Sequence, residues 1–181
     1  MADATLAPSA PLHELTLLEA AKPLRESLLW RLQSSFYQAR GQSAWSDAVV
    51  PNFVTSNSFI ANAYAKIVLN FLRDWFLRHP GADATQPMYI IEVGSGHGKL
   101  AFLLARELLA AREQWPDPAA AKPPFVIVVT DFTSASLPFW AGHSRIKPLL
   151  EAGVVDLACC GGWGGGGRGG VGNAPRRPRA R

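Results

Sequence analysis

The chain has 181 residues, 48% of them apolar, which suits one globular domain with a real core and is too short for two ordinary domains. Its formal net charge of +4 would suggest a nucleic-acid partner if the charge were spread over the body. It is not, because residues 161–181 hold five arginines and no acid, and the remaining chain has 13 basic against 14 acidic residues. The composition therefore excludes a generally basic, nucleic-acid-binding body.

The cysteine content and the hydropathy of the chain indicate in which cellular compartment the protein is expected. Cys159 and Cys160 are adjacent, so they cannot build a disulfide framework, and neither has partners spaced for zinc. No apolar run approaches the roughly 20 residues that span a bilayer. The first 24 residues lack arginine and contain three acids, which argues against a secretory or mitochondrial presequence. We expect a soluble cytoplasmic protein with no membrane partner and no metal.

The N-terminal part is expected to be helical. Residues 1–11 are small, polar and proline-containing, and are predicted to be disordered, whereas residues 12–21 favour a short helix. Pro23 fits the first turn of a second helix that ends at Gly41. Its apolar residues recur at four-residue spacing, which predicts a buried stripe of Leu24, Leu28, Leu32 and Phe36.

Residues 41–58 form an irregular connection whose length favours a functional loop. Ser56 or Asn57 is expected to cap the next helix, which should run to about Arg78. The apolar pattern predicts that this helix points inward the residues Phe59, Ala63, Ile67, Phe71 and Trp75, joined by Ile60, Tyr64, Val68, Leu72 and Phe76. Such a wide stripe predicts cover on more than one side.

A glycine-rich segment follows. Residues 89–93 are apolar and β-branched, which predicts a strand buried on both faces, as parallel sheets require. Gly94, Gly96 and Gly98 come next, and the apolar spacing from Lys99 to about Gln114 predicts a helix. Strand, glycine turn and helix in that order aim backbone N–H groups at one spot, which is typical of a site for a nucleotide-like ligand.

The glycine spacing narrows the class of ligand. A phosphate-binding Walker loop fails at two positions, because Val93 stands where its first glycine belongs and Leu100 where its Ser or Thr belongs. The dinucleotide fingerprint is weakened by Lys99 at its third glycine position. The pattern that fits is acid-x-Gly-x-Gly-x-Gly, starting at Glu92. It resembles motif I of the class I S-adenosylmethionine-dependent methyltransferases, although a tight turn in an unrelated α/β protein remains an alternative.

The resemblance implies a cofactor, S-adenosylmethionine, and a set of residues that bind it. In that family the loop binds the methionine half of the cofactor, and the acid at the strand end orients its ammonium group. The resemblance therefore implies an open hollow above Gly96 and the cofactor-binding residues Glu92, Gly94, Ser95, Gly96 and Gly98. In the same family an acid after the second strand bonds the hydroxyl groups of the cofactor's ribose. Residues 125–130 predict that strand, and Asp131 follows it, so the resemblance gives Asp131 this role; the alternative is an Asp that caps a turn.

The rest of the chain supplies one more strand. A turn or the capped start of a helix is predicted at residues 134–138, a helix at 143–152 and a third strand at 154–158. We therefore expect an α/β fold, a partial Rossmann-like methyltransferase core of about three parallel strands. Its divisions would be a disordered N-terminus (1–11), a helical cap region (12–87), the cofactor-binding domain (88–158) and a disordered tail rich in Gly, Arg and Pro (159–181). The family has a seven-stranded sheet, which suggests that this chain is truncated after its third core strand.

Residues 35–158 resemble one poorly characterised methyltransferase subfamily, chiefly through residues 44–74, the glycine motif and residues 128–140. Helices before motif I commonly cover the cofactor there, which makes Asn57, Asn62 and Tyr64 candidates to approach the ligand; helix capping or packing is the alternative role for each. The expected function is methyl transfer to an unknown acceptor, with no catalytic residue nominated and activity in doubt because of the truncation. The alternative is a non-enzymatic protein whose Gly/Arg tail contacts RNA or whose half-core contacts a partner, with self-association through the sheet edge after the third strand.

Overall fold

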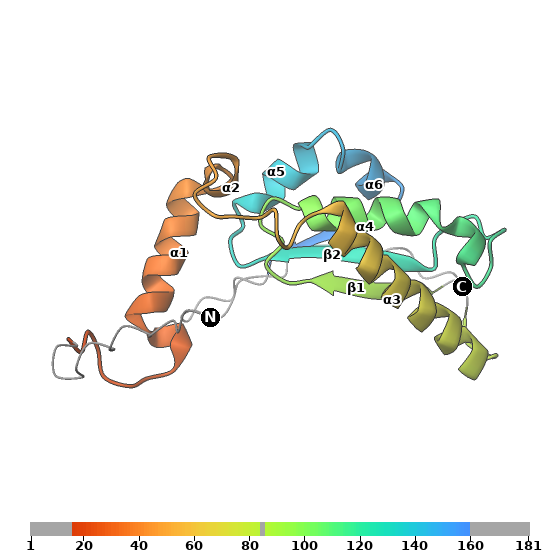
Figure 1. Ribbon diagram of the computed structural model, residues 1–181, viewed down its shortest axis with the longest axis horizontal. Helices are drawn as coiled ribbons and strands as arrows, with labels where there is room; N and C mark the ends of the chain where they lie inside the picture. Colours follow the sequence, from red (N-terminus) through yellow and green to blue (C-terminus); the bar gives the residue numbers. More distant parts are fainter. Residues whose placement is uncertain (1–15, 84–85, 160–181) are drawn as a thin grey trace, which may run out of the picture.

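The computed structural model describes residues 16–83 and 86–159, which form a mixed α/β fold (Figure 1). The expectations for residues 1–11 and 160–181 lie outside this range. The elements in chain order are η2 (Leu24–Glu26), α1 (Leu28–Arg40), α2 (Ser43–Ser46), α3 (Ser58–Arg78), β1 (Met88–Glu92), α4 (Lys99–Ala110), η3 (Arg112–Gln114), β2 (Phe125–Asp131), α5 (Ser136–Gly142), α6 (Lys147–Glu151) and β3 (Val155–Cys159).

The three strands form one parallel sheet in the order β1-β2-β3. Met88 pairs with Phe125 and Glu92 with Val129, while Ile127 pairs with Val155. The strand–helix–strand prediction is confirmed within one residue at both strands and at the start of α4. α4 ends at Ala110, four residues before the predicted end near Gln114, and η3 follows it. Since parallel strands end at the same edge of a sheet, Glu92 and Asp131 come to one place.

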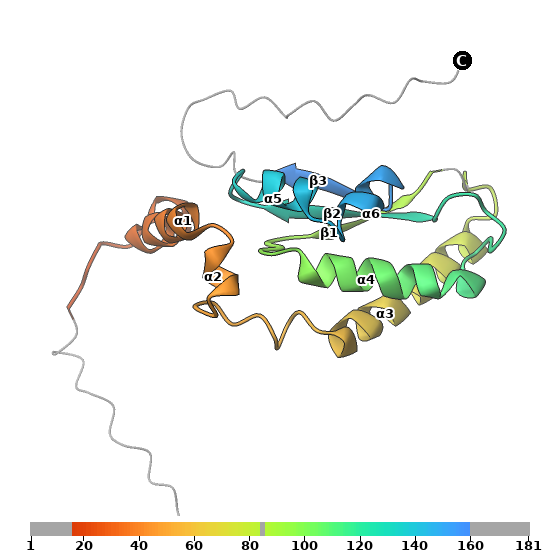
Figure 2. The same cartoon turned by 90° about the horizontal axis from the view of Figure 1, so that it is seen from above.

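The helices cover one face of the sheet. α4 contacts β2, and both α5 and α6 contact β3. These helices lie above the strands in Figure 1, and Figure 2 shows the same helices from above. Beneath them Phe125, Ile127 and Val129 are fully buried, together with Trp140. This layer is the hydrophobic core that holds β2 in place.

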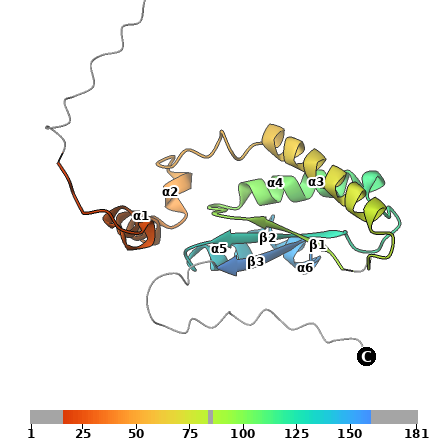
Figure 3. The same cartoon turned by 90° about the horizontal axis from the view of Figure 1, so that it is seen from below.

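The opposite face of β1 is open. Tyr89 is 65% exposed and Ile91 is 64% exposed, and the view from below shows the strands facing the reader (Figure 3). The expectation that β1 is buried on both faces is therefore wrong. A parallel sheet buries both faces only where helices cover both, and the described residues supply helices on one side.

α3 has the predicted length but buries a different side. It packs against α4 and buries Ala61, Ala65, Leu69 and Leu72, while Phe59, Ile67 and Phe71 are exposed. The inward row predicted from Phe59 to Trp75 is therefore wrong. α4 likewise buries Ala101 and Ala105, and small side chains let two helices approach closely. A helix that is apolar on most sides does not reveal from its pattern which side will meet this partner.

The N-terminal helices also differ from expectation. The described part of the predicted helix 12–21, residues 16–21, is not helical. The helix expected from Pro23 is interrupted at Ser27, whose hydroxyl accepts a hydrogen bond from the backbone N–H of Trp30 and caps α1. α1 ends at Gly41 as predicted, but it has no buried residues, and the expected stripe is not covered. The helix expected at 143–152 is reduced to α6. α5 begins at Ser136, within the residues where a turn or the capped start of a helix was expected.

Gly98 lies at the junction between the glycine loop and α4, and a substitution there tests how closely this junction is packed. Its φ angle is +74°, and a Cβ built there would lie 3.0 Å from Nε1 of Trp140. We expect Gly98→Ala to lower the free energy of unfolding by about 1–3 kcal/mol, because backbone strain and a tight contact add. Urea denaturation followed by circular dichroism measures this.

The matched control is Gly142→Ala, where a Cβ would meet nothing within 4 Å. It should change stability by about 0.5 kcal/mol or less. Equal effects of the two substitutions would contradict the assigned junction.

Candidate functional site

The glycine loop joins β1 to α4 and is tied to β2. Gly94, Gly96 and Gly98 have φ angles of 71°, 57° and 74°, so all three positions favour glycine. The Ser95 N–H donates to the carbonyl of Thr130 at 2.8 Å, and the Ser95 hydroxyl accepts from the Thr130 N–H at 3.2 Å. The Thr130 hydroxyl donates to the carbonyl of Glu92 at 2.7 Å. These bonds hold the loop across the ends of both strands.

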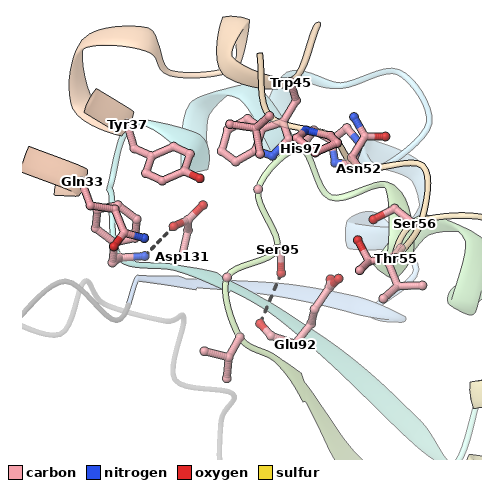
Figure 4. Close-up of a pocket in the computed structure, with 17 residues that line it drawn as sticks. Gln33, Tyr37, Trp45, Asn52, Thr55, Ser56, Glu92, Ser95, His97 and Asp131 are labelled. Atoms are coloured by element: carbon pink, nitrogen blue, oxygen red, sulfur yellow. Dashed lines mark hydrogen bonds between the residues drawn. The ribbon is translucent and has the colours of Figure 1, made fainter. Parts of the chain in front are cut away.

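A pocket of about 500 Å³ lies over this loop, at the carboxyl ends of β1 and β2 (Figure 4). Its volume is in the range of small-molecule sites. It is lined by Gln33, Tyr37, Trp45, Val50, Pro51, Asn52, Thr55, Ser56, Glu92, Val93, Gly94, Ser95, Gly96, His97, Leu100, Asp131 and Phe132. Three parts of the chain therefore meet here: α1, the connection between α1 and α3, and the strand ends.

Asp131 contributes a buried carboxylate. The residue is 4% exposed, and its carboxylate accepts hydrogen bonds from the N–H of Phe132 at 2.7 Å and from the Ser136 hydroxyl at 3.5 Å. Burial raises its pKa above the ordinary value, and the N–H groups of Phe132, Thr133 and Gly96 offset part of that rise. These fixed donors orient the carboxylate toward the loop.

Glu92 contributes the second carboxylate. Burial raises its pKa to about 7, although hydrogen bonds from Ser95 and from the N–H of Ala101 oppose the rise. Its Oε2 atom is buried with no hydrogen-bond partner in the described structure. A buried carboxylate oxygen without a partner is costly, and a cation or a donor placed in the pocket would relieve that cost.

The charge of the pocket indicates the kind of ligand it suits. Two carboxylates line it, and no lysine or arginine is among the described residues that do so. The phosphate-binding Walker loop adds a lysine to its glycines, and no lysine is among the described lining residues here. Aromatic rings of Tyr37, Trp45 and Phe132 also line the pocket, and such rings attract cations. The arrangement suits a cationic organic ligand better than an anionic nucleotide.

Trp45 covers part of the glycine loop. A Cβ built on Gly96 would lie 2.8 Å from the Trp45 ring, so the open hollow expected directly above Gly96 is wrong at that point. The indole stacks on Tyr37 with centroids 5.3 Å apart and on His97 with centroids 6.2 Å apart. Nε2 of Gln42 donates to the carbonyl of Gly96 at 3.3 Å. α2 thus rests on the loop, and the pocket opens beside it.

Most residues proposed for cofactor binding meet in this pocket. Its lining includes Glu92, Gly94, Ser95, Gly96 and Asp131. Gly98 does not line the pocket; it begins α4 and lies against Trp140.

The three candidates on α3 lie elsewhere. Asn57 caps α3 by accepting from the N–H of Ile60 at 3.0 Å, and Asn62 donates to Glu107 at 3.1 Å. Tyr64 is half exposed on α3, and none of the three is among the lining residues.

Sequence reasoning missed the upper wall. Trp45, Asn52, Thr55 and Ser56 come from the connection between α1 and α3, and Gln33 and Tyr37 come from α1. The one available signal was the length of the irregular stretch 41–58, which favours a functional loop without saying which of its residues face a ligand.

Comparisons with known proteins give no family. The chain matches no protein-family model, and a search of curated proteins finds no relative. Within residues 16–83 and 86–159, no helix combines the length and apolarity that a bilayer crossing needs. The same residues hold no cluster of three or more His, Cys, Asp or Glu side chains able to bind a metal ion. The pocket itself therefore carries the functional argument.

Glu92→Gln should reveal the cost of the buried carboxylate. A carboxyl group whose pKa is raised to about 7 in the folded state destabilises the fold progressively as the pH rises from about 4.5 to 7. We expect the variant to be more stable than the wild type by about 2 kcal/mol at pH 8 and equal to it at pH 4. Urea denaturation at both pH values measures the difference.

Glu113→Gln is the control, because Glu113 is exposed and lies in η3, outside the pocket. Its stability should match the wild type at both pH values. A gain in Glu92→Gln that is the same at pH 4 and pH 8 would contradict the assigned ionisation.

A double-mutant cycle tests the contact between Trp45 and the loop. Gly96→Ala should destabilise the wild type through both backbone strain and the clash with Trp45, but should destabilise Trp45→Ala only through strain. We expect a coupling of about 1–2 kcal/mol in the free energy of unfolding. The same cycle with Gly94→Ala should give none, since its Cβ would meet nothing within 4 Å. Equal couplings in the two cycles would place Trp45 away from Gly96.

Proposed function

We propose that this chain binds S-adenosylmethionine in the glycine-loop pocket and is the core of a class I methyltransferase acting on an unidentified acceptor. One observation carries the proposal. The carboxylates of Glu92 and Asp131 end neighbouring parallel strands and face one pocket whose described lining has no cationic side chain. S-adenosylmethionine is an uncommon nucleoside because it carries a sulfonium and an ammonium group and no phosphate.

Each carboxylate has a role that its surroundings support. Glu92, with an unpartnered buried oxygen, is suited to bind the ammonium group. Asp131 is buried and held by fixed donors, and it is suited to accept hydrogen bonds from two neighbouring ribose hydroxyls. Gly94 and Gly96 have no side chains, so the backbone of the loop can approach the ligand closely.

The protein contributes position and electrostatics to the reaction. When bound, the cofactor supplies an electrophilic methyl group on sulfur. Glu92 and Asp131 would fix the two ends of the ligand, so that the acceptor meets the methyl group in line. Tyr37 and Trp45 would exclude water and offer ring faces to positive charge.

The finer description of the fold is part of this proposal. We infer that the three-stranded parallel sheet of the described residues is part of a Rossmann-like methyltransferase core. Both β1 and β3 lie at edges of the described sheet, and β1 exposes Tyr89 and Ile91.

An association role is the second candidate. The exposed apolar residues of β1 and the outer side of α3, Phe59, Ile67 and Phe71, favour a binding protein that pairs with a partner or with itself. Under this alternative the glycine loop is a tight turn and the pocket has no cofactor. The RNA-binding variant of this role concerns the tail, which lies outside the described residues.

Calorimetric titration of the full chain separates the two candidates. We expect S-adenosylmethionine to bind, and ATP and NAD⁺ to give no heat, because their phosphates would face two carboxylates and no cationic side chain. Asp131→Asn should weaken binding about tenfold or more while keeping the circular dichroism of the wild type.

Asp156→Asn is the matched control, since Asp156 lies exposed on β3 outside the pocket. It should bind as the wild type does. A folded chain that gives no heat with S-adenosylmethionine, or that binds ATP more tightly, would overturn the proposal and leave the association role.

A further inference from the structure

His97 is a pocket residue to which the roles above assign nothing. It lies between Gly96 and Gly98 and lines the pocket. Both of its ring nitrogens, Nδ1 and Nε2, are buried with no hydrogen-bond partner in the described structure. Buried polar atoms are nearly always paired, so two unpaired nitrogens on one ring point to a partner that the folded chain does not itself provide.

The imidazole is held in a defined orientation. It stacks on the Trp45 indole with an interplanar angle of 24°, and the N–H of Gly98 donates to the carbonyl of Ser95 at 2.8 Å, which closes the turn around it. Figure 4 shows His97 with Trp45 and Asn52 on the side of the pocket opposite Glu92. A ligand bound by Glu92 and Asp131 would therefore have His97 on its opposite side.

The protonation state suits proton acceptance. Burial lowers the pKa of His97 and the nearby charge of Lys99 lowers it further, while the neighbouring Ser95 backbone raises it in part although no hydrogen bond to the ring is formed. The ring is therefore neutral at pH 7, with one nitrogen able to donate a hydrogen bond and one able to accept.

The lining also restricts the acceptor. A carboxylate or phosphate acceptor would find no lysine or arginine among the described lining residues to bind its negative charge. A neutral alcohol, phenol or amine needs no such partner. An alcohol or phenol loses its O–H proton when it is methylated, and an amine forms an ammonium group that can pass an N–H proton to a base.

We propose that His97 faces the transferable methyl group and accepts the proton of a neutral O–H or N–H acceptor, an inference that rests on the proposed function. The acceptor's oxygen or nitrogen forms a bond to the methyl carbon as the carbon–sulfur bond breaks. The electron pair of that bond stays on sulfur, which becomes a neutral thioether. The acceptor's proton passes to the free ring nitrogen of His97 and then to solvent, so charge and atoms balance.

A comparison of two ligands tests the position of His97 without a known acceptor. S-adenosylhomocysteine has no group at the methyl position, whereas sinefungin carries a protonated amine there. We expect the wild type to bind sinefungin about tenfold more tightly, because a neutral His97 nitrogen can accept a hydrogen bond from that amine. His97→Leu should abolish this preference and leave the affinity for S-adenosylhomocysteine within about twofold.

Two further variants control the comparison. His143→Leu alters a half-buried histidine outside the pocket lining and should keep the tenfold preference. His97→Gln retains a side-chain acceptor and should keep part of it, which also guards against a misfolded leucine variant.

The outcomes are distinct. A preference lost in His97→Leu and retained in His143→Leu supports the inference. Equal weakening of both ligands would place His97 against their shared adenosyl or amino-acid part, and an unchanged preference would place it away from the methyl; either result overturns the inference and leaves the cofactor site standing. A folded wild type that binds neither ligand nor S-adenosylmethionine overturns the proposed function and this inference with it.

Discussion

The hydrogen bonds that join the glycine loop to β2 are the constraint on which the pocket depends. Ser95 exchanges two bonds with the backbone of Thr130, and the Thr130 hydroxyl bonds the carbonyl of Glu92. These contacts link residues 35 positions apart and fix where β1 ends relative to β2. Glu92 belongs to this junction, and Asp131 directly follows Thr130. The same hydrogen bonds therefore fix the positions of both residues at the pocket.

Burying two acids in one pocket costs stability. Burial raises the pKa of both carboxyl groups, and Glu92 also has an unpartnered oxygen. Proteins keep such costs mainly where a ligand relieves them. The cost of the two buried acids and the suitability of the pocket for a positively charged ligand thus have the same origin.

The sequence predicted the parts of the fold that depend on local chemistry. The strands at β1 and β2, the positive φ angles of the glycine loop and the strand-end position of Asp131 follow from β-branched runs, glycine and parallel pairing. It did not predict that Trp45 lies over Gly96, because that contact joins residues 51 positions apart through an irregular connection. It also misplaced the buried side of α3, since large apolar residues stand on several sides of this helix and its pattern does not single out the alanines that meet α4.

The alanine-rich contact between α3 and α4 links the two walls of the pocket. α4 starts at the glycine loop, and the residues just before α3, among them Thr55 and Ser56, line the facing wall. Ala61 and Ala65 of α3 and Ala101 and Ala105 of α4 are buried, and the packing of α3 on α4 bears on the distance between those walls. A single methylene added in this contact would push the two helices apart and widen the space between the walls. Residues that no ligand touches would then govern the size of the ligand.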